Sequence, residues 1–104
     1  TQLQSLILHH GRMTTVDLSG LSNLRRLDLV GWRSLERVEG LSGLRDLRTL
    51  DLGGCVRLAN IDELFGLTTL QTIDLRDCDA IPPRAIAKLR RALPDCSIES
   101  GGYG

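Results

Sequence analysis

A leucine pattern returns at a fixed interval along the chain, and this repeat limits the folds that the sequence can adopt. Leu24, Leu47 and Leu70 are separated by 23 residues, and each begins the pattern Leu-x-x-Leu/Ile-x-Leu. An earlier unit begins at Leu3 and is two residues shorter. Self-similarity at such a period is typical of folds that are built from stacked repeats. The remaining leucine-pattern positions are Leu6, Leu8, Leu27, Leu29, Leu50, Leu52, Ile73 and Leu75.

The last two apolar positions of each pattern predict a short strand. They are two residues apart, and strand side chains alternate between two faces, so both side chains point inward. One turn of this length cannot bury that face alone, so successive turns are expected to stack and their strands to form a parallel sheet. On the return limb apolar residues recur at every third position, which predicts extended or 3-10 segments. Examples are Leu35, Val38, Leu41 and Leu44.

The C-terminal part of the sequence predicts a cap. Ile86, Leu89 and Leu93 lie at helical spacing in a segment from about Pro83 to Leu93. Leu93, Cys96 and Ile98 then reproduce the spacing of the leucine pattern, which predicts a fifth strand. We interpret residues from about 80 to 99 as a cap that shields the last turn. The sequence therefore predicts one α/β domain of four repeats and a cap over 1–99, followed by a flexible tail over 100–104.

With these features the sequence resembles the leucine-rich-repeat family over residues 1–99. The phrases LRTLDLGGC (47–55) and LQTIDLRDC (70–78) are similar to the cysteine-bearing repeats of plant intracellular immune receptors and of bacterial leucine-rich-repeat proteins. The closing phrase KLRRALPDCSI (88–98) is similar to a terminal repeat of bacterial members. The resemblance implies a short, arc-shaped solenoid with a concave parallel sheet of about five strands, an irregular or 3-10 convex side and a C-terminal capping helix.

One position of the repeat departs from the family pattern in the first two units. It is usually Asn or Cys, and this sequence has Gly11, Trp32, Cys55 and Cys78 there. The two cysteine thiols are expected to lie inside, near loop carbonyl groups, as weak donors and small apolar fillers. Trp32 has two possible roles: it fills the core in place of the usual residue, or it stands on the rim as a binding anchor.

The outward-facing strand positions predict a candidate partner-binding face. The middle column of the concave sheet is expected to contain three carboxylates in a row, about 4.8 Å apart, which repel one another unless a positive group relieves them. Flanking arginines can supply that group within the chain, or a basic partner can supply it. The expected column is Ile7, Asp28, Asp51, Asp74 and Ser97, and the expected partner-binding residues are Asp28, Asp51, Asp74, Arg26, Arg76 and Trp32.

The residue types argue against catalysis, a metal or a cofactor. Ser5 and His9 would stand about 13 Å apart on one strand, too far for a nucleophile and its base. His9 and His10 are consecutive, so in a strand they would point to opposite faces and could not grip one metal ion. Gly53 and Gly54 lack the third glycine and the lysine of a phosphate-binding loop. We therefore expect a non-enzymatic protein with no cofactor and no metal.

Charge and cysteine content narrow the class of partner and the compartment. Thirteen basic residues balance thirteen acidic ones, and the three aromatic residues are scattered, so neither nucleic acid nor an anionic membrane is an expected partner. The odd number of cysteines, without paired spacing, favours a reducing, cytoplasmic location.

These observations lead to one expected function and two alternatives. The expected function is protein recognition by the C-terminal repeat part of a larger intracellular receptor or signalling protein, similar to an immune receptor, with an upstream domain covering the first repeat. The first alternative is a free-standing adaptor or inhibitor. The second is a structural spacer or assembly element whose open edge, Leu3 to Leu8, joins another copy.

Overall fold

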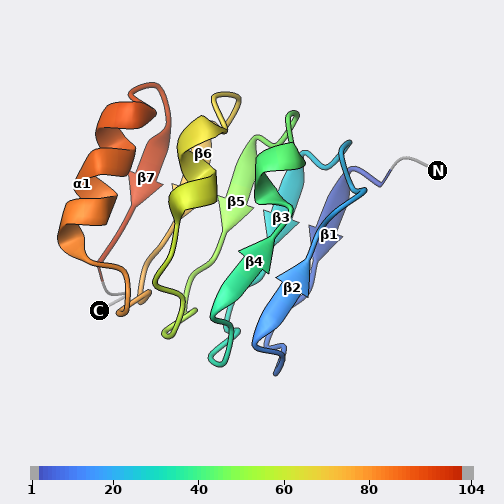
Figure 1. Ribbon diagram of the computed structural model, residues 1–104, viewed down its shortest axis with the longest axis horizontal. Helices are drawn as coiled ribbons and strands as arrows, with labels where there is room; N and C mark the ends of the chain where they lie inside the picture. Colours follow the sequence, from blue (N-terminus) through green and yellow to red (C-terminus); the bar gives the residue numbers. More distant parts are fainter. Residues whose placement is uncertain (1–2, 102–104) are drawn as a thin grey trace.

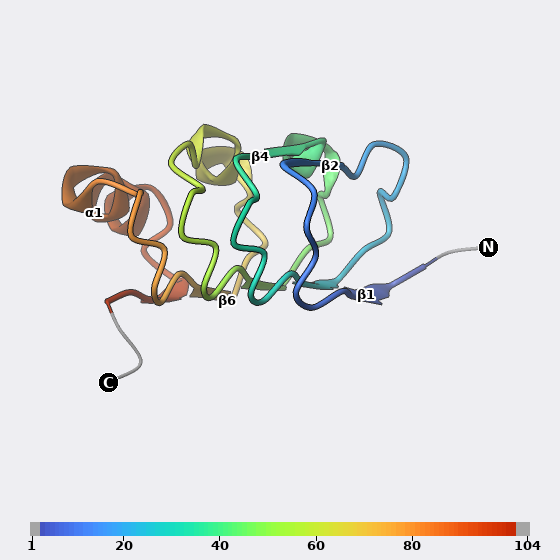
Figure 2. The same cartoon turned by 90° about the horizontal axis from the view of Figure 1, so that it is seen from below.

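The computed structural model describes residues 3–101, which form two layers connected at both edges by loops (Figures 1 and 2). One layer is a five-stranded sheet, and the other contains a two-stranded sheet, two 3-10 segments and one helix. The elements are β1 (Ser5–Ile7), β2 (Thr15–Asp17), β3 (Arg26–Asp28), β4 (Arg37–Glu39), η1 (Leu41–Gly43), β5 (Thr49–Asp51), η2 (Asp62–Gly66), β6 (Thr72–Asp74), α1 (Pro83–Ala92) and β7 (Ser97–Glu99).

The predicted parallel sheet is confirmed. Its strand order is β1-β3-β5-β6-β7, and all four pairings are parallel. The apolar residue at the centre of each strand lies beside its counterpart in the next strand, so each turn buries the inward side of its neighbour. The aligned residues are Leu6, Leu27, Leu50, Ile73 and Ile98.

The opposite layer agrees with the sequence in part. The 3-10 segments η1 and η2 confirm the expectation for the return limb. The two-stranded parallel sheet of β2 and β4 was not predicted, and it aligns Val16 with Val38. All of these segments, together with α1, lie on one side of the five-stranded sheet (Figure 2). The other side of that sheet is its outer face, and no further element of residues 3–101 covers it.

The predicted helix is confirmed, but the register predicted for the last strand is wrong. In the sheet Ile98 lies beside Ile73, so Ser97 pairs with Thr72 and Glu99 pairs with Asp74. The outer column therefore ends in Glu99 instead of Ser97. The physical reason is that a helix rises only about 1.5 Å per residue against about 3.3 Å for extended chain, so a helical return limb needs more residues to span the same turn.

The core runs through all the turns between the two layers. It consists mainly of leucines, and Leu24, Leu27, Leu29 and Leu35 are fully buried. At the corner after β1, β3, β5 and β6 the chain adopts a left-handed backbone conformation, with positive φ, at the same position of the turn. The four residues are His10, Gly31, Gly54 and Asp77. Glycine adopts this conformation without steric cost, which accounts for Gly31 and Gly54 at two of the four corners.

Candidate functional site

A row of carboxylates crosses the outer face of the five-stranded sheet. Asp28, Asp51 and Asp74 lie side by side on β3, β5 and β6, with Ile7 before them and Glu99 after them. Adjacent parallel strands are about 4.8 Å apart, so each carboxylate lies within the range of strong repulsion by the next. We call Asp28, Asp51, Asp74 and Glu99 the acidic row.

Each aspartate of the row also has a local structural role. One carboxylate oxygen accepts a hydrogen bond from the backbone N–H two residues further on. The distances are 3.2 Å from Val30 to Asp28, 3.0 Å from Gly53 to Asp51 and 3.0 Å from Arg76 to Asp74. Such side-chain turns stabilise the chain where it leaves the strand. This local bond explains why the residue type repeats, whether or not the row binds a partner.

Basic side chains contact two members of the row. At the β1 end, His9 Nε2 lies 3.0 Å from Asp28 Oδ1, and Arg26 Nη2 lies 4.0 Å from Asp28 Oδ2. Asp28 is only 7% exposed, so these contacts accompany an almost complete loss of water. On β6 the guanidinium of Arg76 contacts both oxygens of Asp74, at 3.1 Å and 2.8 Å. Of the two sources of positive charge that the sequence left open, flanking arginines and a basic partner, the structure shows Arg26 and Arg76 in contact with the row.

Asp51, in the middle of the row, has no such partner. No salt bridge joins it to a basic side chain within residues 3–101. Burial raises the pKa of Asp51 above its ordinary value, and the nearby carboxylates of Asp74 and Asp28 add to this rise. The hydrogen bond from the backbone N–H of Gly53 and the charge of Arg76 act in the opposite direction but do not cancel it. The pKa of Asp74 behaves in the opposite way: burial acts to raise it, but hydrogen bonds and the charge of Arg76 hold it below its ordinary value. Of the three aspartates of the row, Asp51 is therefore the one without a salt bridge to a basic side chain in the described residues.

The sequence placed His9 on the outward side of the first strand but did not include it among the candidate partner-binding residues. In the register of the sheet His9 stands at the same turn position as Val30, Gly53 and Arg76. A histidine and an arginine thus occupy this position at the two ends of the series, while the two inner turns have an apolar residue and a glycine. The shorter spacing of the first unit is the signal that would have aligned His9 with Arg76.

Trp32, which the sequence placed among the candidate partner-binding residues, lies in the core. It is 6% exposed, and its indole N–H donates to the carbonyl of Leu8. The role of a rim anchor is therefore wrong for this residue, and the alternative of a core filler is confirmed. Space for the ring exists because residue 11 is glycine: a Cβ atom there would lie 2.3 Å from the ring carbons.

The two inner cysteines make the equivalent contact in the later turns. Cys55 Sγ lies 3.3 Å from the carbonyl oxygen of Leu29, and Cys78 Sγ lies 3.0 Å from that of Leu52. Burial raises the pKa of Cys55 to about 11 and that of Cys78 to about 12. Both thiols are therefore protonated donors at neutral pH, as expected from the sequence.

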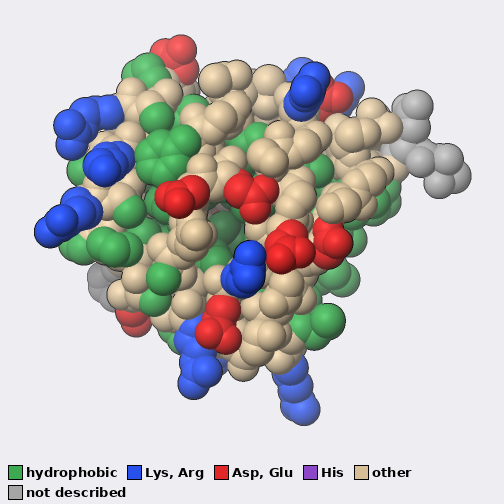
Figure 3. Space-filling view, viewed as in Figure 1, with side chains coloured by type: hydrophobic (Ala, Val, Ile, Leu, Met, Phe, Trp, Pro, Cys, Tyr) green, Lys and Arg blue, Asp and Glu red, His purple; other side chains and the backbone are tan. Residues whose placement is uncertain are grey.

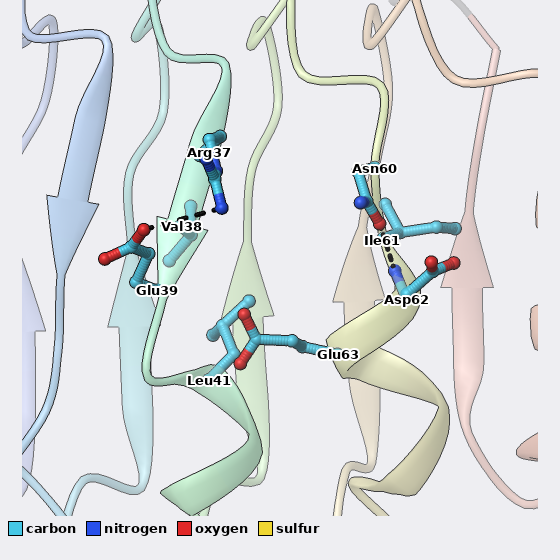
Figure 4. Close-up of a pocket in the computed structure, with 8 residues that line it drawn as sticks. All are labelled: Arg37, Val38, Glu39, Leu41, Asn60, Ile61, Asp62 and Glu63. Atoms are coloured by element: carbon cyan, nitrogen blue, oxygen red, sulfur yellow. Dashed lines mark hydrogen bonds and ion pairs between the residues drawn. The ribbon is translucent and has the colours of Figure 1, made fainter.

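A small cleft lies in the opposite layer, between β4 and the chain leading into η2 (Figure 4). Its volume is about 90 Å³, well below the roughly 300 Å³ at which small-molecule sites begin. Glu63 reaches across to accept a hydrogen bond from the backbone N–H of Ser42, at 3.1 Å, and so uses its carboxylate to join η2 to η1. The lining residues are Arg37, Val38, Glu39, Leu41, Asn60, Ile61, Asp62 and Glu63.

Two further properties of the described residues concern metal binding and membrane crossing. Within 3–101, no group of three or more His, Cys, Asp or Glu side chains is arranged to hold a metal ion. Over the same range, no helix has both the length and the apolar character that crossing a membrane requires.

Comparison with protein families and with curated proteins identified no relative of this chain. No family model matches the sequence, and no curated protein matches it.

Proposed function

We propose that this chain is a leucine-rich-repeat module that recognises a protein partner through the concave, outer face of its five-stranded sheet. The proposal includes an arc-shaped solenoid, a cytoplasmic location and a place at the C-terminal side of a larger receptor or signalling protein. The resemblance of the cysteine-bearing repeats to those of immune receptors supports this assignment. The repeated corner contacts of Trp32, Cys55 and Cys78 support it independently of the resemblance.

The observation that carries the proposed binding mode is the incomplete neutralisation of the acidic row. Asp28 and Asp74 have basic partners within the chain, whereas Asp51 lies between them without a salt bridge. A lysine or arginine of a partner that approaches Asp51 relieves repulsion from both neighbours, so it gains more than it would at an isolated surface carboxylate. The proposed partner is therefore a protein segment with a basic side chain at its centre.

The strand residues beside the row suit such a partner. Thr49 and Thr72 are the outward-facing neighbours of Asp51 and Asp74 on their strands, and they present short hydroxyl side chains. Hydroxyls can accept or donate hydrogen bonds without obstructing the approach of a long basic side chain. In this proposal the face contributes binding and orientation only, and no residue acts as a catalyst or holds a cofactor.

Selection from a random peptide library displayed on phage tests the proposal. We expect the immobilised chain to enrich peptides with lysine or arginine, and we expect Asp51→Arg to abolish that enrichment. Asp62→Arg is the matched control, because it makes the same charge change on η2, in the opposite layer. Peptides without a basic preference, or equal selection by the wild-type chain and Asp51→Arg, would overturn the proposed binding mode.

A further inference from the structure

The exposed large apolar side chains of residues 3–101 all lie in the first turn. Leu3, Ile7, Leu8 and Met13 are 46%, 48%, 44% and 63% exposed. Single exposed apolar residues are common on protein surfaces, but a set confined to one end of a molecule indicates an interaction surface. The remaining turns have no exposed large apolar residue in the described part of the chain.

Three of these four residues occupy inward positions of the repeat. The register of β1 with β3 makes Leu3 and Leu8 equivalent to Leu24 and Leu29. The register of β2 with β4 makes Met13 equivalent to Leu35. Leu24, Leu29 and Leu35 are fully buried, and each of them has a preceding turn stacked on it. The first turn therefore keeps the inward residues of the repeat although no turn of residues 3–101 covers them.

The backbone of the first turn is open in the same direction. β1 is an edge strand of the five-stranded sheet, and β2 belongs to a pair with no further strand in the described residues. In β3 the N–H of Arg26 and the carbonyl of Asp28 bond to the preceding turn. Ser5 and Ile7 are their register partners, so the same backbone groups face the open edge of β1.

The residue types that protect sheet edges in other proteins are absent from residues 3–8 of this edge. Natural edge strands are protected by charge, proline, a bulge or a covering element. Residues 3–8 contain no charged residue and no proline. The opposite end of the molecule differs, because α1 packs there and carries the basic residues Arg84, Lys88, Arg90 and Arg91. The basic side chains on that end are visible in Figure 3.

We infer that the N-terminal face binds a further leucine-bearing turn of the same architecture, with its strand parallel to β1 and its return limb over Met13. This inference extends the proposed function, since it assumes that the chain is a repeat module. A turn is favoured over a lone strand because the exposed surface spans both layers, from Leu3 and Leu8 to Met13. Its inward residues are predicted to be apolar where they meet Leu6 and Leu8, as they are at every internal junction.

The test extends the chain by one turn. A copy of residues 47–69 is placed directly before Leu3, replacing Thr1 and Gln2, so that the 23-residue spacing continues. We expect a higher urea midpoint than that of the 104-residue chain. We also expect at least tenfold slower hydrogen exchange at the amides of Ser5 and Ile7 and slower oxidation of Met13 by peroxide, because all three become covered. The matched control carries Leu47→Ser, Leu50→Ser and Leu52→Ser in the copy only, and it is expected to resemble the unextended chain.

Three results would overturn the inference. One is an extended chain with unchanged exchange at Ser5 and Ile7, and a second is an extended chain that fails to fold. The third is a dimer of the 104-residue chain that forms as its concentration rises, with slower hydrogen exchange at the amides of Ser5 and Ile7. The N-terminal face would then bind a second copy of the chain. Peptide selection with the extended chain separates this inference from the proposed function. If the extended chain no longer selected basic peptides through Asp51, the proposed function would be contradicted. The exchange and oxidation results, which test the stacking of the added turn, would not be affected.

Discussion

At the scale of single residues, three chemically different side chains perform one task at the corner of the turn. Trp32, Cys55 and Cys78 each donate a hydrogen bond to the carbonyl of the leucine that directly follows the strand of the preceding turn. A buried carbonyl without a hydrogen-bond donor would reduce the stability of the fold by about 1–3 kcal/mol. A donor is therefore needed at this position, and either an indole N–H or a thiol can supply it. The sequence predicted the role of the cysteines, because they recur at the repeat period. It left the position of Trp32 open, since one tryptophan shows no periodicity.

The contact between Gly11 and Trp32 predicts a coupled pair. Gly11→Ala places a methyl group within 2.3 Å of the indole ring and is expected to destabilise the protein by about 1–3 kcal/mol. Gly66→Ala is the control, because a Cβ atom there meets nothing within 4 Å. Urea unfolding measures both. In a Trp32→Cys background, which removes the ring and keeps a donor, Gly11→Ala should cost little. Equal costs for Gly11→Ala and Gly66→Ala would show that the ring does not need this space.

The raised pKa of Asp51 predicts how stability changes with pH. Below the pH at which carboxyl groups ionise in the unfolded chain, Asp51 is protonated in both states and carries no penalty. The folded state holds the Asp51 proton more tightly than the unfolded state does, because the pKa of Asp51 is raised on folding. As pH rises through this raised pKa, Asp51 ionises in the folded protein as well, and the stability that the bound proton contributed is lost. Asp51→Asn keeps an acceptor for the N–H of Gly53 and removes this loss.

We therefore expect Asp51→Asn to unfold at higher urea than the wild type at pH 7 and at about the same urea at pH 3. Asp74→Asn should show the opposite sign at pH 7, because the lowered pKa of Asp74 means that its ionised form stabilises the fold. Urea titrations from pH 3 to 7 measure both differences. If Asp51→Asn were less stable than the wild type at pH 7, the centre of the acidic row would not be the uncompensated position.

At the scale of elements, the spacing of leucines was sufficient to predict five strands, the 3-10 segments and the capping helix. It was insufficient for two features of the ends. The register of β7 depends on how many residues α1 uses to cross the opposite layer, and the leucine-like spacing of Leu93, Cys96 and Ile98 suggested the internal period instead. The pairing of β2 with β4 depends on contacts between two return limbs, and the first limb has only a loose version of the repeat.

The connection between α1 and β7 gives a prediction for the cap. Arg90 Nη2 donates to the carbonyl of Ile98 at 3.1 Å and to Ser100 Oγ at 3.0 Å. Arg90→Ala is expected to cost about 0.5–1 kcal/mol and to speed hydrogen exchange in β7 more than in β3. Arg91→Ala, next to it on the same helix, is the control and should leave exchange in β7 unchanged. If the two variants had the same effect on β7, these bonds would not hold the cap strand.

At the scale of the whole molecule, equal numbers of acidic and basic residues conceal local groups of like charge. The acidic row lies on the outer face of the sheet, and four basic residues lie on α1 in the other layer. Figure 3 shows the layer that contains α1. Basic side chains gather at the end of the molecule where α1 lies, and acidic side chains lie towards the middle. Net charge alone therefore excludes a long-range field but does not exclude a local preference for basic ligands. The sequence could predict this local preference only because the aspartates share the repeat period.

The acidic row is the central element of the proposed function, and its contribution to affinity can be measured directly. Isothermal titration of the tightest-binding basic peptide from the phage selection would compare the wild-type chain, Asp51→Arg and Asp62→Arg. We predict at least a tenfold loss of affinity for Asp51→Arg, about 1.4 kcal/mol, and no comparable loss for Asp62→Arg. Equal affinities of the three proteins for this peptide would contradict recognition through the outer face of the sheet.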